Sequence, residues 1–235
     1  MKKLDLTHLN PEQHRAVQTI DKPVLLLAGA GSGKTRVITY RIAHLVSNCK
    51  VPPPHILALT FTNKAAAEMR ERVQELLPKN SKGLTVTTFH SLCVRFLREY
   101  IHLLGYQKDF VIFDTASQMS TLKTIYEDED IDAQTYNLKA TFFEIMKAKG
   151  KGDGPEYFLN QSFDAFAQVT GKLYQEYNRV LKGCNALDFE DILHLTIDLF
   201  KRFPEELEPL KRRYEYIMVD EYQDTNRVQY QLIRY

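Results

Sequence analysis

The sequence predicts an α/β protein in which a parallel sheet is wrapped by helices and interrupted by a mainly helical insertion. Two observations support this class. In the first 105 residues, short apolar runs alternate with longer segments of helical periodicity. From residue 110 the strand signal nearly vanishes, until one more apolar run occurs at residues 216–219. Strands that alternate with helices favour parallel pairing, because each crossover helix returns the chain to the same edge of the sheet.

The composition is that of a globular protein with balanced charge. Of the 235 residues 44% are hydrophobic, and the formal net charge is +1. This total neither indicates nor excludes a nucleic-acid partner, because a local basic groove can lie within it. Three scattered cysteines predict neither a zinc cluster nor a disulfide framework. Without a long apolar run or a secretion signal, we expect a cytoplasmic protein with no membrane partner.

The first elements can be placed in order. A helix is expected from Pro11, because Asn10 is a favourable N-cap and Gln13 stands where a capping box needs it. The apolar run at residues 24–27 predicts a buried strand, which a glycine-rich turn joins to a helix. The elements expected next are strands at residues 55–61 and 84–89, a helix from residue 62 that ends before residue 78, and a helix at residues 91–104.

Residues 110–185 are interpreted as the helical insertion, so that residues 1–109 and 186–235 form the other domain. Apolar residues from 163 to 181 recur at helical spacing, which predicts a helix face packed in a core. The acidic run at 127–130 is expected at a solvated helix end. Residues 147–154 are expected to form a flexible basic loop, either a plain surface turn or a contact for phosphates.

A phosphate site is predicted at the turn between the first strand and its helix. Glycines allow successive N–H groups to point at an anion, and the helix N-terminus adds partial positive charge. Lys34 is expected to reach the β- and γ-phosphates and Thr35 to place its hydroxyl on Mg²⁺, as in a Walker A loop. A turn that binds nothing is the alternative, and the strand and helix around it argue against that. The predicted nucleotide-binding residues are Ala28, Gly29, Ala30, Gly31, Ser32, Gly33, Lys34 and Thr35, with alanine at the first place, where the general pattern has glycine.

Two adjacent carboxylates follow the last predicted strand, at residues 216–219. The carboxyl ends of parallel strands form the crevice in which such sheets bind ligands. Asp220 is therefore expected to hold Mg²⁺ together with Thr35, and Glu221 to orient and deprotonate an attacking water. Adjacent carboxylates also occur on surfaces by chance, but the glycine-rich loop in the same chain favours a site. The predicted catalytic residues are Lys34, Asp220 and Glu221.

Five short motifs, of which the phosphate loop is one, follow one another along the chain in a specific order. They are residues 9–13, 28–35, 60–66, 87–91 and 220–226, the last reading Asp-Glu-Tyr-Gln-Asp-Thr-Asn. Together they resemble the UvrD/Rep/PcrA family of superfamily-one DNA helicases. The resemblance implies a RecA-like domain interrupted by a helical domain, and an intact protein that uses ATP and Mg²⁺ to move along DNA from 3′ to 5′.

The resemblance also implies roles for single residues and for partners. Gln13, which by its position suits a capping box, would read the adenine edge, since its amide offers both an acceptor and a donor. Contacts with single-stranded DNA are implied for Phe61, Asn63, Thr88, Phe89 and His90. The implied partners are single-stranded DNA, duplex junctions, a C-terminal RecA-like domain, and repair or replication proteins.

The sequence stops before the family's γ-phosphate-sensing motif and its second RecA-like domain. Arginines that contact a transferred phosphoryl group are worth about 10³–10⁵ in rate in related enzymes. We therefore expect this chain alone to be a poor ATPase that does not unwind DNA. Two alternatives stay open: a module that holds nucleotide, DNA or protein without turnover, and the helicase part of a recombination helicase-nuclease.

Overall fold

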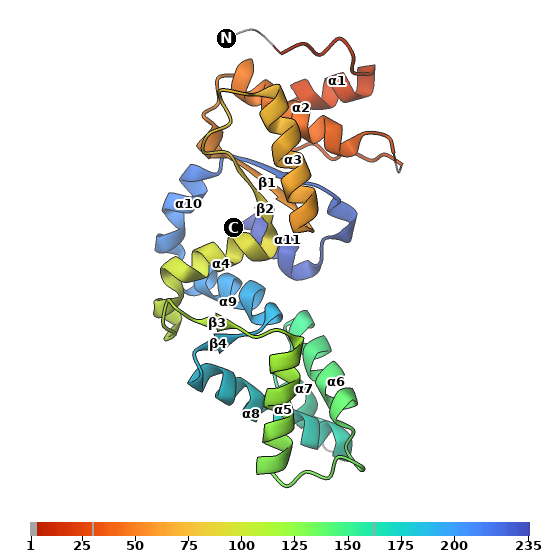
Figure 1. Ribbon diagram of the computed structural model, residues 1–235, viewed down its shortest axis with the longest axis vertical. Coiled ribbons are helices and arrows are strands. Elements are labelled where there is room, and N and C mark those ends of the chain that lie inside the picture. The colour runs from red at the N-terminus through yellow and green to blue at the C-terminus, as the bar shows by residue number, and fades with distance from the viewer. Residues whose placement is uncertain (1–3, 30, 162) are drawn as a thin grey trace. The chain divides into compact units, whose positions relative to one another are not determined.

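The computed structural model describes residues 4–29, 31–161 and 163–235, and contacts divide the chain into two compact units (Figure 1). Unit 1 lies within Met1–Ser91 and Glu205–Thr225, and unit 2 within Leu92–Pro204 and Asn226–Tyr235. The sequence predicts a narrower insertion, at residues 110–185, and the contacts join further residues on both sides of it to unit 2. The predicted domain boundaries stay a prediction.

Unit 1 is built on a parallel sheet of three strands in the order β2-β1-β5. The strands are β1 at Ile56–Thr60, β2 at Thr85–Thr88 and β5 at Tyr216–Val219. Ala58 of β1 lies opposite Val86 of β2 and Met218 of β5. Because β1 is buried along its whole length, its sequence is a nearly continuous apolar run instead of an alternating one. The predicted α/β class with a parallel sheet is confirmed.

Helices carry much of the core of unit 1. Helices α2 and α3 pack against each other, and α3 lies along β1 and β2 (Figure 1). Their fully buried side chains include Ile42, Leu45, Met69 and Val73. Each such side chain contributes about 1.5–3 kcal/mol by leaving water. The helical elements of unit 1 are α1 at Pro11–Gln18, α2 at Lys34–Ser47, η1 at Pro53–His55, α3 at Asn63–Leu76, α10 at Glu208–Arg213 and η4 at Tyr222–Asp224.

The segment before the glycine-rich turn differs from its prediction. The sequence predicts a buried strand at residues 24–27, but the structure has a segment without sheet pairing, in which Leu27 is 84% exposed. Of these four residues, Leu26 packs against the core cluster that contains Val17 and Val37. A segment becomes a strand only when a neighbour pairs with its N–H and C=O groups. Among the described residues, no strand pairs with this segment.

Unit 2 is mainly helical, with one short pair of parallel strands, β3 at Val111–Ile112 and β4 at Ala186–Leu187. Helix α8 packs against α5 and α6, and the core residues between them include Leu122, Ile145, Leu173 and Tyr177. The remaining helical elements, of which α4 and η3 span the unit boundary, are α4 at Phe89–Tyr100, η2 at Ile101–Leu104, α5 at Thr115–Asp128, α6 at Leu138–Lys151, α7 at Glu156–Leu159, α8 at Ala165–Gly183, α9 at Phe189–Arg202, η3 at Pro204–Leu207 and α11 at Arg227–Arg234.

Most predictions for the helical part are confirmed. The predicted helix at residues 163–181 is α8, and the acidic run at 127–130 is exposed at the end of α5. Phe163, however, is fully exposed and lies outside α8. Asp164 is the N-cap of this helix, whose first residue is Ala165. Within the described residues, no helix combines the length and the apolar character needed to cross a membrane.

The predicted basic loop at residues 147–154 is instead largely helical. Helix α6 continues through these lysines and ends at Lys151. Its C-cap is Gly152, whose φ of +85° lies in the left-handed region typical of a helix cap. Lys149 is only 5% exposed, so it is not a surface contact for phosphates. The local sequence could not indicate this, because the partners of Lys149 are Asp188 and Asp191, at the start of α9.

Candidate nucleotide-binding site

The glycine-rich turn has the backbone shape that the sequence predicts for it. Gly31 and Gly33 have φ angles of +73° and +88°, in the left-handed region that side chains disfavour. At Gly33 an added Cβ would also lie 3.1 Å from the Gln13 amide nitrogen. The positive φ favours glycine at this position, and a Cβ would in addition push the Gln13 amide aside by a few tenths of an ångström. Lys34 is the first residue of α2, which places the turn at a helix N-terminus. Ala30, predicted to bind nucleotide, lies outside the described residues.

The ammonium of Lys34 lies over the start of this turn. Its Nζ donates hydrogen bonds to the carbonyl oxygens of Ala28 and Gly29, both at 3.2 Å. The Ser32 hydroxyl donates to the same Gly29 oxygen at 2.6 Å. A phosphate oxygen carries a negative charge and would form a stronger hydrogen bond with the ammonium than these neutral carbonyls do. Lys34 is therefore placed to exchange its contacts with the loop for a bound anion.

Thr35 and Asp220, separated by 185 residues in the sequence, meet in unit 1. The Thr35 hydroxyl donates to Asp220 Oδ2 at 3.0 Å. Asp220 is buried, and its backbone N–H donates to the Leu59 carbonyl at 2.9 Å, which extends the pairing of β5 with β1. The other oxygen of Asp220, Oδ1, accepts a hydrogen bond from the Glu221 N–H at 3.0 Å. The carboxylate is thus held by the sheet and aimed at the start of α2.

This pair of oxygen atoms fits a magnesium ion. Hydroxyl and carboxylate oxygens are hard ligands, and neighbouring ligands of an octahedral Mg²⁺ lie about 2.9–3.0 Å apart when each bond is about 2.1 Å. The distance from Thr35 Oγ1 to Asp220 Oδ2 is 3.0 Å. Among the described residues, no group of three or more His, Cys, Asp or Glu side chains could hold a metal. Mg²⁺ bound to phosphates needs no such group, because one or two protein ligands suffice for it.

Glu221 lies at a sharp turn, two residues after the last residue of β5. Its φ and ψ are +49° and +44°, a left-handed conformation that costs a residue with a side chain about 1–2 kcal/mol. Its carboxylate accepts a hydrogen bond from the Gln223 amide. This contact was not among the predictions from the sequence, in which its only signal is a glutamine two residues after the carboxylate. The pair fixes the direction of a carboxylate that the backbone already turns away from the strand.

Gln13 completes the capping box that its position predicts. The Asn10 carboxamide oxygen accepts from the Gln13 N–H at 2.8 Å, and Gln13 Oε1 accepts from the Asn10 N–H at 3.2 Å. Gln13 Nε2 also donates to the Ser32 carbonyl in the glycine-rich turn, at 3.1 Å. One lone pair and one N–H of the amide are left over, which is the combination an adenine edge needs. Capping and adenine recognition are therefore compatible.

The five residues predicted to contact DNA differ in exposure. Asn63 is exposed, and Phe61 and His90 are half-buried. Phe89 is 2% exposed and its ring packs against that of Phe61, with centroids 6.0 Å apart. Thr88 is buried as the N-cap of α4. We therefore assign Phe89 a packing role behind Phe61, because a covered ring offers no face to a base. Burial lowers the pKa of His90, so its ring is neutral at pH 7.

Thr88 caps the start of α4 through its hydroxyl group. Its hydroxyl oxygen accepts a hydrogen bond from the Ser91 N–H at 3.2 Å and donates to the Ser91 hydroxyl at 2.9 Å. This is the usual arrangement at the start of a helix. In this structure Thr88 orders the turn between β2 and α4, where His90 is presented.

Comparison with known proteins decides the family. The model of the UvrD/REP helicase N-terminal domain matches residues 9–235. The chain belongs to this family. Its similar relatives include the ATP-dependent DNA helicase PcrA of Bacillus subtilis (strain 168), 46% identical over 229 residues, and that of Staphylococcus aureus (strain Mu50 / ATCC 700699), 43% identical over 229 residues. Each match covers 97% of this chain and 31% of the relative, so the chain spans about a third of the length of these family members.

Proposed function

We propose that this chain binds Mg-ATP and single-stranded DNA as the N-terminal part of an ATP-dependent DNA helicase that moves from 3′ to 5′. The contact of Thr35 with Asp220 carries the proposal, because it joins the phosphate-binding helix to the carboxylate at the end of β5. The similarity to proteins named as DNA helicases supports it.

Each polar residue of the site has a distinct task in this proposal. Lys34 binds the β- and γ-phosphates, and Thr35 and Asp220 would hold Mg²⁺, which neutralises phosphate charge when bound. Glu221 accepts the proton of the attacking water, and Gln223 keeps its carboxylate in place. Gln13 contacts the adenine edge with the hydrogen-bonding groups that the capping box leaves over.

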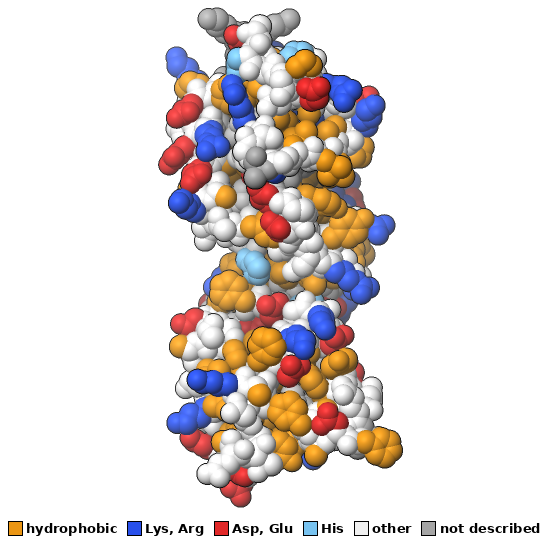
Figure 2. All heavy atoms as spheres, turned by 90° about the vertical axis from the view of Figure 1, so that its right-hand side faces the viewer, with side chains coloured by type: hydrophobic (Ala, Val, Ile, Leu, Met, Phe, Trp, Pro, Cys, Tyr) orange, Lys and Arg blue, Asp and Glu red, His pale blue; other side chains and the backbone are white. Residues whose placement is uncertain are grey.

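The proposed DNA surface comprises Phe61, Asn63 and His90, at the ends of β1 and β2 in unit 1. Phe61 offers a ring for stacking, and Phe89 supports it from behind. On the face shown in Figure 2, basic and acidic side chains are interspersed. We expect the stacking of bases on the Phe61 ring to contribute to DNA affinity.

We propose further that turnover needs a second RecA-like domain, so that this chain alone binds ATP but hydrolyses it slowly. Steady-state ATP hydrolysis by the 235-residue chain, with and without a single-stranded oligonucleotide, tests this together with a nucleotide titration. Binding with negligible turnover is the expected result. Strong hydrolysis stimulated by DNA would contradict it, and would mean that the chain completes its site in another way, for example by self-association.

Replacing Lys34 by alanine should weaken ATP binding about tenfold to a hundredfold, because a charge-assisted hydrogen bond contributes about 1.5–3 kcal/mol. Isothermal titration calorimetry with ATP in the presence of Mg²⁺ measures the affinity. The variant Lys79→Ala, which removes an exposed lysine of the same unit, is the control and should bind as the unaltered chain does. Equal ATP affinities for the two variants would show that Lys34 does not contact the phosphates.

Replacing Phe61 by leucine should weaken binding of single-stranded DNA about fivefold or more, since stacking on an aromatic ring contributes about 1–3 kcal/mol per base. Fluorescence anisotropy of a labelled oligonucleotide measures it. The matched variant Phe89→Leu should lower the unfolding temperature but change DNA affinity little, because its ring is buried behind Phe61. A loss of DNA affinity in Phe89→Leu but not in Phe61→Leu would show that Phe89 is the stacking residue and Phe61 the packing one.

A further inference from the structure

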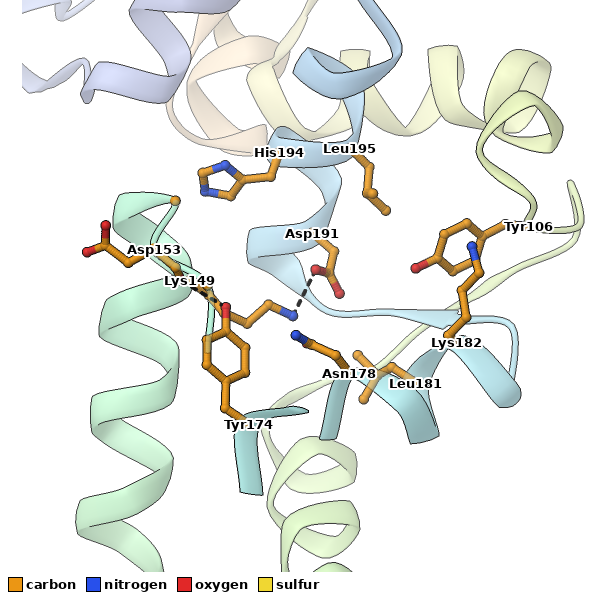
Figure 3. A pocket seen from close by; sticks show the side chains of 12 residues that line it. Tyr106, Lys149, Asp153, Tyr174, Asn178, Leu181, Lys182, Asp191, His194 and Leu195 are labelled. Carbon is orange, nitrogen blue, oxygen red and sulfur yellow. Dashed lines mark hydrogen bonds and ion pairs between the residues drawn. The ribbon is translucent and has the colours of Figure 1, made fainter. Parts of the chain in front are cut away.

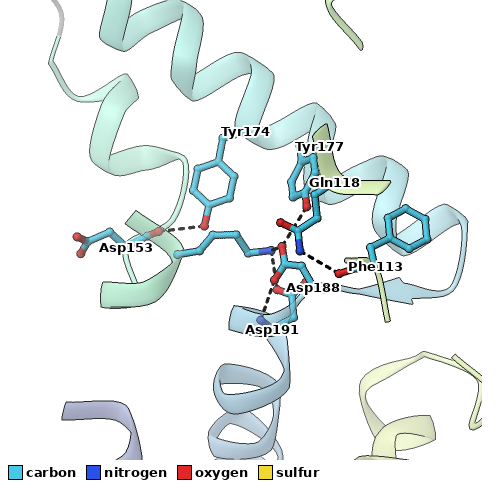
Figure 4. Close-up of polar contacts among 8 residues, drawn as sticks. Phe113, Gln118, Asp153, Tyr174, Tyr177, Asp188 and Asp191 are labelled. Atoms are coloured by element: carbon cyan, nitrogen blue, oxygen red, sulfur yellow. Dashed lines mark hydrogen bonds and ion pairs between the residues drawn. The ribbon is translucent and has the colours of Figure 1, made fainter. Parts of the chain in front are cut away.

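Three charged side chains meet inside unit 2, and we call them the Lys149 cluster. Lys149, near the end of α6, lies 2.5 Å from Asp188 Oδ2 and 2.8 Å from Asp191 Oδ1, measured from its Nζ. Asp188 is fully buried. The Tyr177 hydroxyl of α8 donates a further hydrogen bond to Asp188 Oδ2 at 3.2 Å (Figure 4). The cluster therefore joins α6 to the neighbouring helices α8 and α9, across 39 residues of sequence between Lys149 and Asp188.

Both carboxylates are held rigidly by the start of α9. Asp188 Oδ1 accepts from the Asp191 N–H at 2.9 Å, and Asp191 Oδ2 accepts from the Asp188 N–H at 3.1 Å. Each aspartate thus uses one oxygen for the capping box and the other for Lys149. This geometry leaves neither carboxylate free to turn toward water without breaking the cap.

The charges in the cluster do not balance. Two carboxylates face one ammonium, so the fully ionised cluster holds one net negative charge in a buried place, which is costly. The other titratable groups around it are Glu190 and His194 on α9, Tyr174 and Lys182 on α8, Asp153 after α6, Glu156 on α7 and Tyr106 after η2. Burial lowers the pKa of His194, so this ring supplies no compensating charge at neutral pH.

A cavity of about 420 Å³ opens beside the cluster (Figure 3). Its lining includes Lys149, Tyr174, Asn178, Asp191 and His194. In Figure 3 the Asp191 carboxylate points into this space. Water can therefore reach Asp191, whereas Asp188 is covered, and a proton can enter or leave at Asp191 without unfolding of the helices.

The geometry points to a proton-sensitive link between α6 and α9: the Lys149 cluster holds the two helices together most tightly when Asp191 carries a proton, and it loosens when that proton leaves. The cause of this proton sensitivity is electrostatic, because a proton on Asp191 makes the buried cluster neutral. The link is independent of the proposed ATP and DNA binding, whose residues lie in unit 1. It acts instead on the end of α6, inside the helical part of the chain.

The direction of the pH effect follows from Asp191. Burial, together with the charge of Asp188, raises the pKa of Asp191 to about 6 from an ordinary value of 3.8, although Lys149 lowers it. A carboxyl group whose pKa is raised by folding contributes stability that is fully present below the lower value and is lost as pH rises through the higher one. The link is therefore tightest in acid and loosens across pH 4–6.

The test replaces Asp191 by asparagine, which has the shape of the protonated acid and no charge. Its one oxygen can accept from the Asp188 N–H or from Lys149, so the readout is the pH dependence of the stability ratio and not its absolute size. Urea unfolding of the 235-residue chain at a series of pH values gives folding constants for both proteins. The ratio of the variant's constant to that of the unaltered chain should grow about tenfold to a hundredfold between pH 4 and pH 7 and then level off. In the folded unaltered chain, the carboxyl carbon of Asp191 should titrate near pH 6 by NMR.

A second measurement tests the link itself, and a second variant serves as control. At pH 8, amide hydrogen exchange at the end of α6, residues 149–152, should be slower in Asp191→Asn than in the unaltered chain. Asp198→Asn alters an aspartate of the same helix in an exposed pair with Arg202 and should leave both readouts unchanged. A ratio that is independent of pH, an Asp191 titration near 4, or unchanged exchange at the end of α6 would each overturn the proposal.

Discussion

Replacing Lys149 by methionine should lower the free energy of unfolding by about 3–5 kcal/mol at pH 8. Methionine fills a similar volume but leaves Asp188 and Asp191 buried without their ammonium, and removing one member of a buried ion pair costs about that much. Urea unfolding followed by circular dichroism measures the change. This is a large fraction of the stability of an ordinary domain, so the variant chain is expected to unfold at far lower urea concentration.

The matched control is Arg202→Met, on the surface of α9. Arg202 pairs with Asp198 at 3.2 Å, but both side chains are about half exposed. Exposed pairs contribute at most about 1 kcal/mol, so this variant should unfold close to the unaltered chain. A loss for Lys149→Met as small as that of the control would mean that water or a neighbouring group compensates the two carboxylates.

Replacing Glu221 by glutamine should reduce ATP hydrolysis by about 10²–10⁴-fold, the usual contribution of a general base, while ATP affinity stays nearly unchanged. Glutamine keeps the size of the side chain but does not take up the proton of water. Hydrolysis is best measured with this chain completed by a second RecA-like domain, because we expect the chain alone to turn over slowly. Single-turnover hydrolysis with excess protein gives the rate, and equilibrium titration gives the affinity.

Glu215 offers a control for this variant at the other end of the same strand. It directly precedes β5, is exposed, and pairs with His55 at 2.8 Å. Glu215→Gln removes a charge of the same kind without touching the proposed site and should hydrolyse ATP normally. If Glu221→Gln also hydrolyses ATP at the original rate, another group takes the proton and Glu221 is not the base.

Much of the fold of unit 1 was predictable because its signals are local. The apolar runs at residues 56–60, 85–88 and 216–219 are strands, and the segments between the first two and after the second are helices. Periodicity reports these elements directly, since burial of one face is a property of neighbouring residues. The capping box at Asn10 and Gln13 was predictable for the same reason, because its two members lie within one helical turn.

The run at residues 24–27 marks the limit of this reasoning. Its apolar residues fit a buried strand as well as those of β1 do, yet Leu27 is exposed and the segment is unpaired. Strand formation depends on a neighbour, and composition does not say whether one lies alongside. Similarly, the aromatic pattern at Phe61 and Phe89 did not indicate which ring is covered by the other.

The sequence by itself determined the class of fold, the glycine-rich turn and the candidate residues of the site, because each of these is written in short segments with strong local preferences. The tertiary structure alone decided that Thr35 meets Asp220, that Gln223 holds Glu221 and that Lys149 is buried between two aspartates. Lysines 147, 149 and 151 look alike in the sequence, but an ammonium stays buried only where carboxylates lie close enough to pair with it. That pairing depends on distances in space, which cannot be deduced from the spacing of residues along the chain.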